Sequence, residues 1–517
     1  MKNKTFTALC TSLALIGLVG AGNPALSQSF TNGPVPVIES GLPNVAITNE
    51  TGAKPDQAPA NPPKEWIDKD TGHRIIRVSD EAGSSSNYFN VNSYTPDGKW
   101  MVFSSPSGIM ALDLKTFATK LIVPGRNALQ FVGTKTGDVY YTTGGGGGAA
   151  SQGTGVGTGL TPKPATGATP SAAPNAAAPA GAQGQGRGGR NMGPRVIMAY
   201  SFATGQSRQI AQLDPGYGIS TINADETLFA GSRETAPNTQ PRVQGPPGSV
   251  GTSRDPGDEL LPNGQKATFA EGREIQINRR LVQHIPMEIF TINIKTGEKK
   301  TITASTDWLN HLQFSPTNPN LLLYCHEGNW HLVDRLWLID VSKKDAKPQL
   351  LHKRTMNMEI AGHEWWSHDG KTIWYDLQTP RGVDFWIAGY DIDTGKRHWY
   401  HMDRNEWGVH FNQSNDRSVF SSDGGDPEMA ARAPDGKYVY LLHPNAVPDI
   451  AGLHAANADA LIEPGFFVSE KLVNMKNHNY RSEPNASFTP DGKWIVFRSN
   501  MWGPGHVYAV ETAKAKQ

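Results

Sequence analysis

The sequence predicts an all-β fold, a single-domain seven-bladed β-propeller, chiefly because one short segment recurs along the chain. YTPDGKWMVFSS at 94–105 returns almost unchanged as FTPDGKWIVFRS at 488–499. Looser copies lie between them: FSPTNPNLLLYC, WSHDGKTIWYDL, FNQSNDRSVFSS and RAPDGKYVYLLH. Each copy joins a polar turn to a short strand, and a second strand with its own turn often follows. Such repeats are typical of propellers, whose blades bury their faces only against one another.

The repeats also predict where each blade begins. The Asp-Gly turns suit tight hairpins, because glycine adopts the positive φ that such turns need. Seven blades fall within the usual range for propellers. The segment 74–78 is expected to close the ring by pairing with the last blade. The predicted blades start near Tyr94, Leu129, Ile219, Leu312, Glu364, His410 and Ala486.

The N-terminal residues are typical of an export signal. Lys2 and Lys4 precede an apolar stretch at 9–19, and small residues follow at 25–27, so we expect a signal peptide at 1–27. The apolar stretch is shorter than the ~20 residues that span a bilayer, although an uncleaved anchor is the alternative. We therefore expect a periplasmic or secreted protein with no membrane contact after cleavage. A Pro-rich leader would occupy 28–62, followed by the propeller domain at 63–517.

Two stretches interrupt the repeats. Residues 144–192 are almost entirely small or polar, with little apolar bulk to bury, which predicts a disordered loop at a hairpin tip. Residues 236–277 are more polar still, and a second disordered insertion is expected there.

Charge and cysteine content exclude some functions. The 48 basic and 48 acidic residues give a net charge of +0, without a basic block for nucleic acid. Cys10 would leave with the signal peptide, so Cys325 would have no disulfide partner. Cys325 ends an apolar run, which favours a buried thiol over a catalytic one.

Reactive side chains gather between 311 and 485. His311, His363, His410 and Asn485 each lie just before or at the repeated strand of a blade, so they should occupy equivalent places on one rim. Any single histidine in such a place could merely cap a turn. Four together indicate a functional site.

These motifs resemble the oligogalacturonate lyases. CHEGNWHLVDRLWLID at 325–340 and GHEWWSHDG at 362–370 are similar to the family's central motifs, with Gly362 in place of threonine. The segment with Asn87, Tyr88 and Phe89, the segment 216–232 and WLNHLQFSP at 308–316 also have counterparts. The resemblance implies that His363 is the catalytic base, Arg335 the catalytic arginine and His410 a metal ligand. It also suggests substrate-binding roles for His311, His326, Glu327, His331, Asn87 and Tyr88.

The expected metal site departs from the family pattern. Where the family has glutamine and two histidines, this chain has Tyr480, Glu483 and Asn485. Glu483 and Asn485 can still offer oxygen to a hard cation, and His478 could join them. We therefore expect a divalent cation, Mn²⁺ with Ca²⁺ as the alternative, held by His410, Glu483, Asn485 and His478.

The predicted reaction is metal-assisted β-elimination on oligogalacturonate-like substrates. A base removes the C5 proton beside the uronate carboxylate, and the C4 oxygen leaves, which produces a 4,5-unsaturated sugar. Arginine and a cation would stabilise the charge that develops on the carboxylate. One alternative is a non-catalytic TolB-like envelope propeller that binds without turnover. Another is hydrolysis by two carboxylates among Glu327, Glu364 and Glu483.

Overall fold

The computed structural model describes residues 62–143, 195–236, 256, 259–424, 437–480 and 482–515. All of them lie in one compact unit, Gly52–Gln517. The predicted signal peptide at 1–27, the leader apart from residue 62, and the insertion at 144–192 lie outside the described residues.

The strands form antiparallel sheets that follow one another in chain order. The first sheet has three strands: β3 (Trp100–Ser105), β4 (Gly108–Asp113) and β5 (Thr119–Pro124). The second has four: β6 (Ala128–Val132), β7 (Val139–Thr143), β8 (Arg195–Ser201) and β9 (Gln206–Leu213). The third comprises β10 (Thr221–Ile222), β11 (Leu228–Glu234), β12 (Met287–Asn293) and β13 (Lys299–Ser305). The fourth comprises β14 (Trp308–Phe314), β15 (Leu321–Glu327), β16 (Leu336–Asp340) and β17 (Gln349–Leu350).

Eight strands then share one sheet. Its first half is β18 (Ile360–Trp366), β19 (Thr372–Gln378), β20 (Phe385–Asp391) and β21 (Arg397–His401). Its second half is β22 (Phe411–Gln413), β23 (Phe420–Ser422), β24 (Tyr438–Ala446) and β25 (Ile462–Asn474). The halves meet where β21 and β25 pair in parallel. Short 3₁₀ turns, η3 (Arg404–Glu406) and η4 (Ala458–Ala460), connect these strands.

The last sheet joins the two ends of the described chain. It contains β1 (Glu65–Ile67), β2 (His73–Arg77), β26 (Ser487–Phe488), β27 (Trp494–Ser499) and β28 (His506–Lys514). β2 pairs with β28, with Ile75 opposite Val510. The expectation that the segment 74–78 joins the last blade is therefore confirmed.

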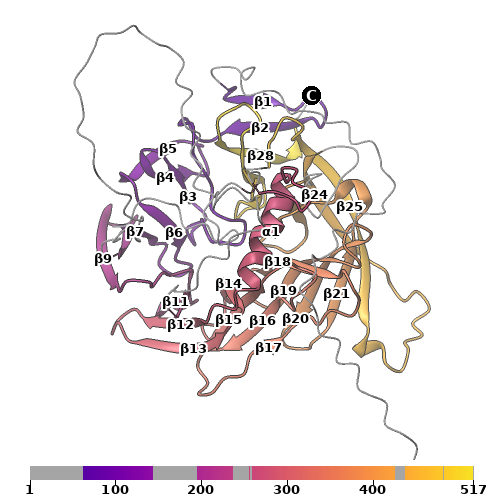
Figure 1. The fold of residues 1–517 in the computed structure, drawn as a ribbon. Coiled ribbons are helices and arrows are strands. Elements are labelled where there is room, and N and C mark those ends of the chain that lie inside the picture. The colour runs from indigo at the N-terminus through magenta and orange to yellow at the C-terminus, as the bar shows by residue number, and fades with distance from the viewer. Residues whose placement is uncertain are drawn as a thin grey trace, which may run out of the picture. The chain divides into compact units, whose positions relative to one another are not determined.

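Apolar clusters between the sheets hold them in a ring. Phe131 of the second sheet packs with Phe229 and Phe290 of the third. Between the last and first sheets, Val496 and Val507 share a buried cluster with Phe103. Each sheet therefore buries a face against its neighbours, as the repeats predicted, and the ribbon follows this order around a common centre (Figure 1). The all-β architecture is confirmed, with one α-helix added.

That helix, α1 (Phe269–Leu281), corrects the expectation for residues 236–277. Thr268 and Glu271 form a capping box that satisfies backbone N–H groups at the start of the helix. Ile277 packs into the cluster around Trp308 and Leu309. The prediction of a disordered insertion is therefore wrong for 259–277, because a good cap and a few buried side chains are enough to order a polar helix. Residues 237–255 and 257–258 lie outside the described chain.

α1 has 13 residues. Within the described ranges, the structure contains no helix long and apolar enough to cross a membrane.

Candidate active site

The innermost strands present polar side chains at matching points. His311 lies in β14 and His363 in β18, where each strand has an irregularity in its register. His410 directly precedes β22, and Asn485 lies two residues before β26. The φ angles of His311, His363 and Asn485 are +51°, +43° and +52°. Such left-handed conformations are uncommon for residues with a Cβ and concentrate at functional sites. Here they recur at one place in successive sheets.

Two histidines at this level lie edge to face, with an angle of 76° between their rings, and each is backed by a carboxylate. The ring centroids of His363 and His410 are 4.7 Å apart. Nδ1 of His363 is 3.2 Å from Oδ1 of Asp376, and Nδ1 of His410 is 2.7 Å from Oδ2 of Asp423. A ring that donates its Nδ1 proton to a carboxylate keeps a lone pair on Nε2. Both rings are therefore oriented to use Nε2 as a base or as a ligand.

His410 is the more tightly held of the two histidines. Its pKa is raised: burial opposes the charged ring, but the negative charge and hydrogen bond of Asp423 outweigh burial. Asp423 also accepts hydrogen bonds from the Tyr480 hydroxyl, at 3.2 Å, and from the backbone N–H of Asn485, at 3.3 Å. One buried carboxylate thus ties together three of the segments that form the site.

Aromatic rings connect the histidines to the first sheet. Tyr88 lies edge-on to His410 and to His311, with centroid distances of 5.1 and 5.7 Å. The ring of Phe89 is 5.2 Å from that of His410. The backbone N–H of Phe89 also approaches Oδ1 of Asn485, at 3.4 Å. The segment containing Tyr88 and Phe89 therefore lies at the centre of the cluster.

Arg335 is the centre of a buried ionic group. Its Nη1 donates to Oε1 of Glu327 at 2.8 Å, and its Nε donates to Oε2 of Glu364 at 3.1 Å. All three side chains are at most 2 % exposed. Burial alone would raise the pKa of Glu327, but Arg335 and His311 lower it well below its usual range. The guanidinium is therefore already bound by two carboxylates.

This ionic group has an unbalanced charge when His311 is neutral. One arginine and two glutamates sum to +1 − 2 = −1, and all three side chains are buried. His311 Nε2 lies 3.3 Å from Glu327 Oε2, yet neither ring nitrogen of His311 has a hydrogen-bond partner. Oε1 of Glu364 is also unpartnered. An unpaired buried charge is costly, so this group would gain from a positively charged partner.

A second group of charges, Glu483 and Arg498, interacts with the histidine pair. Oε2 of Glu483 is 3.9 Å from Nη2 of Arg498. Burial would raise the pKa of Glu483, but His410, Arg498, Arg273 and His363 lower it. Glu483 is therefore close enough to both histidines and to α1 to interact with their charges.

Two predicted site residues, His326 and His331, do not join this cluster, and a third, His478, lies at its edge beside Tyr480. His326 hydrogen-bonds Asp307 at 2.8 Å and stacks on Trp337. His331 lies in the loop before β16, where its backbone carbonyl accepts a hydrogen bond from Arg354. His478 is buried, with Nδ1 2.9 Å from the Ser499 hydroxyl; burial lowers its pKa to about 3. The remaining predicted residues (Asn87, Tyr88, His311, Glu327, Arg335, His363, His410, Glu483 and Asn485) lie in or directly beside the cluster.

The expected metal ligands fit a cation in part. His410 has the carboxylate-backed ring that is usual for a metal-binding histidine. Glu483 and Asn485 add oxygen donors, and His478, whose ring lies 6.1 Å from that of Tyr480, has a buried Nε2 without a hydrogen-bond partner. A different group, His311, Cys325 and Glu327, brings three potential ligand atoms within 4.8 Å of one another in the described chain. Its thiol suits soft metals more than Mn²⁺ or Ca²⁺, and burial raises the pKa of Cys325 well above its usual range.

Several residues of the site were not predicted from sequence. Asp376 and Asp423 orient the two histidines, but Asp423 is followed by glycine and is hard to distinguish from a turn residue. Arg498 lies in a repeated strand, where it resembles an ordinary surface residue. Arg273 lies in the segment expected to be disordered. Only the fold brings these four side chains to the cluster.

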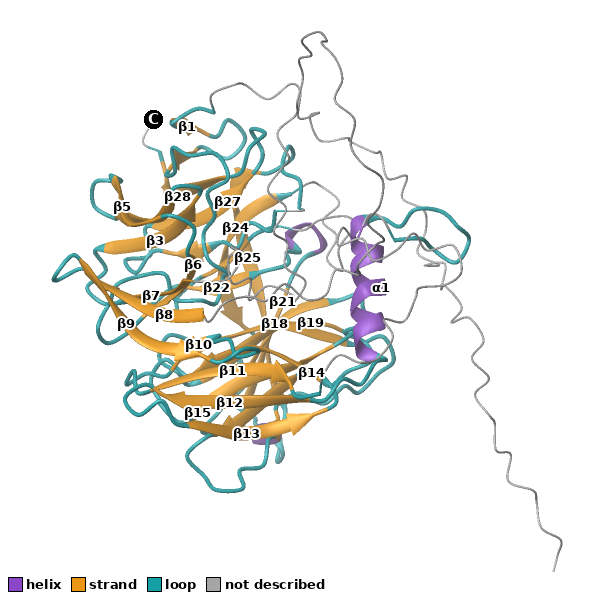
Figure 2. Cartoon of the chain, turned by 60° about the vertical axis from the view of Figure 1, so that its left-hand side comes forward, coloured by secondary structure: helices purple, strands orange, loops and turns teal. Residues whose placement is uncertain are grey.

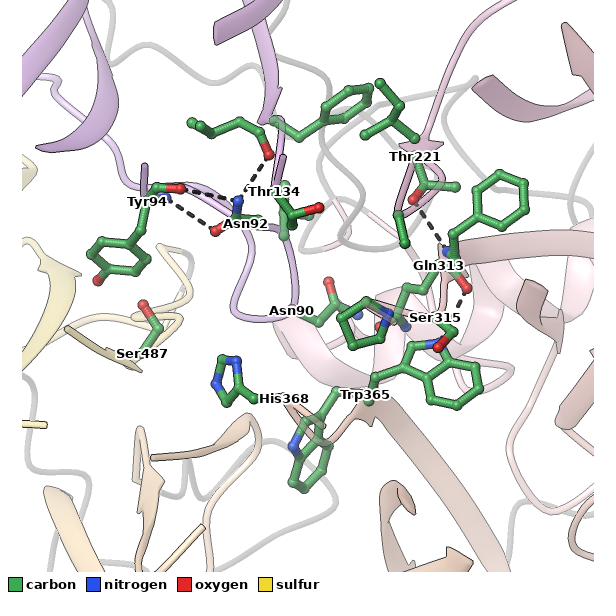
Figure 3. Close-up of a pocket in the computed structure, with 18 of the residues that line it drawn as sticks. Asn90, Asn92, Tyr94, Thr134, Thr221, Gln313, Ser315, Trp365, His368 and Ser487 are labelled. Atoms are coloured by element: carbon green, nitrogen blue, oxygen red, sulfur yellow. Dashed lines mark hydrogen bonds between the residues drawn. The ribbon is translucent and has the colours of Figure 1, made fainter. Parts of the chain in front are cut away.

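A cavity of about 290 Å³ lies farther along the same inner strands (Figure 3). In β18 the site residue His363 precedes Trp365, which lines the cavity, and in β14 His311 precedes Gln313. The cavity is therefore next to the histidine cluster along the axis rather than at it. Its lining carries amides, hydroxyls and aromatic rings, among them Asn90, Asn92, Thr221, Gln313, Trp365 and His368. Among the described residues that line it, none is acidic or basic apart from histidine, so the charged chemistry belongs to the cluster.

Comparison with known proteins places these features in a family context. Residues 282–515 match the family model described as oligogalacturonate lyase. An oligogalacturonide lyase of Pectobacterium atrosepticum is 23% identical over 226 residues, and an oligogalacturonate lyase of Dickeya dadantii is 26% identical over 228. Each match covers 43% of this chain and 54% of the relative. The chain thus spans about half the length of the curated relatives it matches.

Solved structures extend the likeness in fold. An oligogalacturonate lyase in complex with manganese superposes with a TM-score of 0.57 at 18% identity, covering 87% of this chain and 96% of its own. The oligogalacturonate lyase of Vibrio parahaemolyticus gives 0.59 at 18% identity, with coverages of 88% and 97%. The resemblance of this chain to the oligogalacturonate lyase family is therefore confirmed, in sequence over residues 282–515 and in fold over most of its length.

Proposed function

We propose that this protein is a carbon–oxygen lyase that cleaves oligogalacturonate-like substrates by β-elimination. The observation that carries the proposal is the pair of adjacent imidazoles, His363 and His410, each fixed by a carboxylate at Nδ1. The family match supports the same reaction. The partner would be an acidic oligosaccharide.

His363 is the base in this mechanism. With its Nδ1 proton donated to Asp376, its Nε2 lone pair accepts the C5 proton. The electrons of the C5–H bond form the C4–C5 double bond, the C4–O bond breaks, and the departing oxygen takes up a proton. His363 is partly exposed, with 13% of its side chain accessible, so solvent can remove the proton after turnover.

Arg335 is a positioning and electrostatic residue in this proposal. Glu327 and Glu364 already hydrogen-bond its guanidinium, so its field acts on the substrate from a fixed place. The same contacts argue against hydrolysis. A glycosidase needs one carboxyl group free to donate a proton, and these two carboxylates are buried and bound to an arginine.

A divalent cation would bind through Nε2 of His410, with oxygens of Glu483 and Asn485 as further ligands. When bound, it would supply positive charge beside the substrate carboxylate. The imidazole in this set favours Mn²⁺ over Ca²⁺, because Ca²⁺ prefers ligands that are all oxygen. A solved lyase of the same fold is in complex with manganese.

We also propose seven blades for the propeller. Each half of the eight-stranded sheet would be one blade, and the other five sheets one blade each. The export signal at 1–27 would deliver the protein to the periplasm or beyond.

The decisive experiment measures elimination directly. Purified protein is incubated with di- and trigalacturonate, with and without Mn²⁺, and the conjugated 4,5-unsaturated product is followed by its ultraviolet absorbance. We expect a steady increase that His363→Ala abolishes without a change in thermal unfolding. Wild-type protein that produces no unsaturated product from any uronate oligosaccharide would refute the lyase proposal.

A further inference from the structure

The helix α1 lies outside the part of the chain that matches the lyase family model, which begins at residue 282. It enters the chain between β11 and β12 of the third sheet. In Figure 1 α1 crosses in front of the centre of the ring of sheets, and Figure 2 shows it at one side of them. It therefore covers one end of the central axis.

Several contacts fix this helix to the propeller. Glu274 forms an ion pair with Arg381, which follows β19. The guanidinium of Arg280 lies over the ring of Trp308, 5.7 Å from its centroid. Within the insertion itself, Arg279 makes two hydrogen bonds, of 3.0 and 2.7 Å, to the carboxylate of Glu259. α1 is thus anchored through both its charged and its apolar residues.

One arginine on α1 is buried without an equivalent contact. Arg273 is 6 % exposed, and its Nη1 is buried with no hydrogen-bond partner. Ile277, one turn later on the same face of the helix, is 2 % exposed and packs against the sheet that contains His311. The face of α1 that carries Arg273 therefore points into the molecule, and a buried arginine without a full set of acceptors is costly.

The burial of Arg273 and the place of α1 in front of the centre of the ring (Figure 1) put this side chain on the side of the helix that faces the sheets. Its positive charge is one of four that lower the pKa of Glu483, together with those of His410, Arg498 and His363. Among the described residues, no carboxylate lies within ion-pair distance of Arg273, and Glu483 has Arg498 as its 3.9 Å partner. The positive charge of Arg273 thus has no carboxylate partner among the described residues.

Arg335 is already bound by Glu327 and Glu364, and this gives the positive charge of Arg273 a role. Because two carboxylates already hydrogen-bond Arg335, a third carboxylate from a substrate would meet a group with no net positive charge. An oligouronate carries one carboxylate per sugar, so cleavage requires a place for at least two. We propose that Arg273 binds a carboxylate of the substrate, on a sugar next to the one whose C5 proton is removed.

This inference rests on the proposed lyase function and specifies its substrate: an oligosaccharide with uronates on both sides of the cleaved bond. Arginine suits the role, since its planar fork matches a carboxylate and it stays charged. The substrate would complete the hydrogen bonding that Arg273 lacks in the free protein. It would also hold α1 in place over the bound chain.

The test compares Arg273→Gln and Arg273→Lys with two controls. Arg126→Gln removes the same charge from an exposed loop, and Arg279→Gln weakens the anchoring of α1 without altering the proposed contact. We expect Arg273→Gln to raise KM for digalacturonate about ten-fold, as the loss of one charge-assisted hydrogen bond implies, with kcat within about two-fold. Arg273→Lys should recover part of the loss, because it keeps the charge.

A modified substrate separates carboxylate recognition from a structural role. On digalacturonate methyl-esterified only at the sugar that keeps its C5 proton, wild type and Arg273→Gln should have similar KM values. An equal ten-fold difference on both substrates would mean that Arg273 acts through the helix, and would overturn the inference. An unchanged KM of Arg273→Gln on the unmodified substrate would also overturn the inference, but it would leave the lyase proposal intact.

Calorimetry keeps the inference testable if wild-type protein shows no elimination. The lyase proposal would then fail, but binding of trigalacturonate can still be measured. Binding about ten-fold weaker in Arg273→Gln than in Arg126→Gln would support carboxylate recognition by Arg273. Equal binding by the two variants would overturn it.

Discussion

Asp376 should control the reaction although it does not touch the substrate. Its Oδ1 lies 3.2 Å from Nδ1 of His363 and stabilises the tautomer that keeps Nε2 unprotonated. Asparagine at this position can present an amide N–H to Nδ1, which places the ring proton on Nε2 instead. His363 would then have no lone pair facing the substrate. Asp376→Asn therefore changes the base while preserving its position.

The size of the effect follows from the interaction removed. A hydrogen bond to a charged group contributes about 1.5–3 kcal/mol, and each 1.36 kcal/mol corresponds to about ten-fold in rate. We expect kcat to fall by about 10- to 100-fold with little change in KM, because Asp376 acts through His363. Asp376 is buried, so the bond is not weakened by solvent.

The assay is the initial rate of unsaturated-product formation over a range of digalacturonate concentrations. Asp384→Asn is the matched control. Asp384 also pairs with a histidine in the same sheet, His401 at 3.4 Å, but at a distance from the cluster and exposed to solvent. Its variant should retain wild-type kcat. If Asp376→Asn kept kcat within about two-fold of wild type, the assignment of His363 as an Asp376-oriented base would be wrong.

Three further outcomes are expected. Glu327→Gln should lower the free energy of unfolding in urea by about 1.5–3 kcal/mol, because it removes a charge-assisted hydrogen bond of Arg335 while Glu364 still pairs the guanidinium; a loss below about 1 kcal/mol would contradict that hydrogen bond. Burial would raise the pKa of Glu359, but hydrogen bonds from His352 and Thr355 lower it to about 2. The ionised Glu359 carboxylate should stabilise the fold fully above its usual pKa of about 4.5, and this stabilisation should disappear as the pH falls toward 2. Glu359→Gln should therefore lower the free energy of unfolding by about 3 kcal/mol at pH 6 and by almost nothing near pH 2. A loss of stability that does not change with pH in denaturant titrations would refute this. Removal of metal with a chelator should abolish elimination, and added Mn²⁺ should restore it. In His410→Ala, added Mn²⁺ should not restore elimination. Activity that survives chelation would exclude a required cation.

The position of Arg335 limits how a charged substrate can be recognised. Arg335 lies beneath the site with two carboxylates already bound, whereas Arg273 lies at the end of the axis with an unpartnered nitrogen. The buried arginine supplies a fixed field, and the one on α1 is available to bind a ligand. The two guanidinium groups therefore suit different tasks, although the sequence alone does not distinguish them.

Strand alternation separates two of the residues that the sequence assigned to one site. His326 and Glu327 are neighbours in β15, so their side chains point to opposite faces of the sheet. Glu327 reaches Arg335, and His326 packs against Trp337 on the other face. The two side chains therefore cannot both join the cluster, and the period of two along a strand is sufficient to predict this.

The sequence by itself determined the repeated strands, the closing pair of β2 with β28, and the matching positions of His311, His363, His410 and Asn485. These features depend on local turns and on a short repeat, and both can be read along the chain. Only the tertiary structure decided which carboxylates orient the histidines, that Arg335 is already bound by two glutamates, and that Arg273 on α1 is buried with an unpartnered nitrogen. The reason is that these contacts join residues whose separation in sequence carries no periodic signal, and the folded ring alone brings them together.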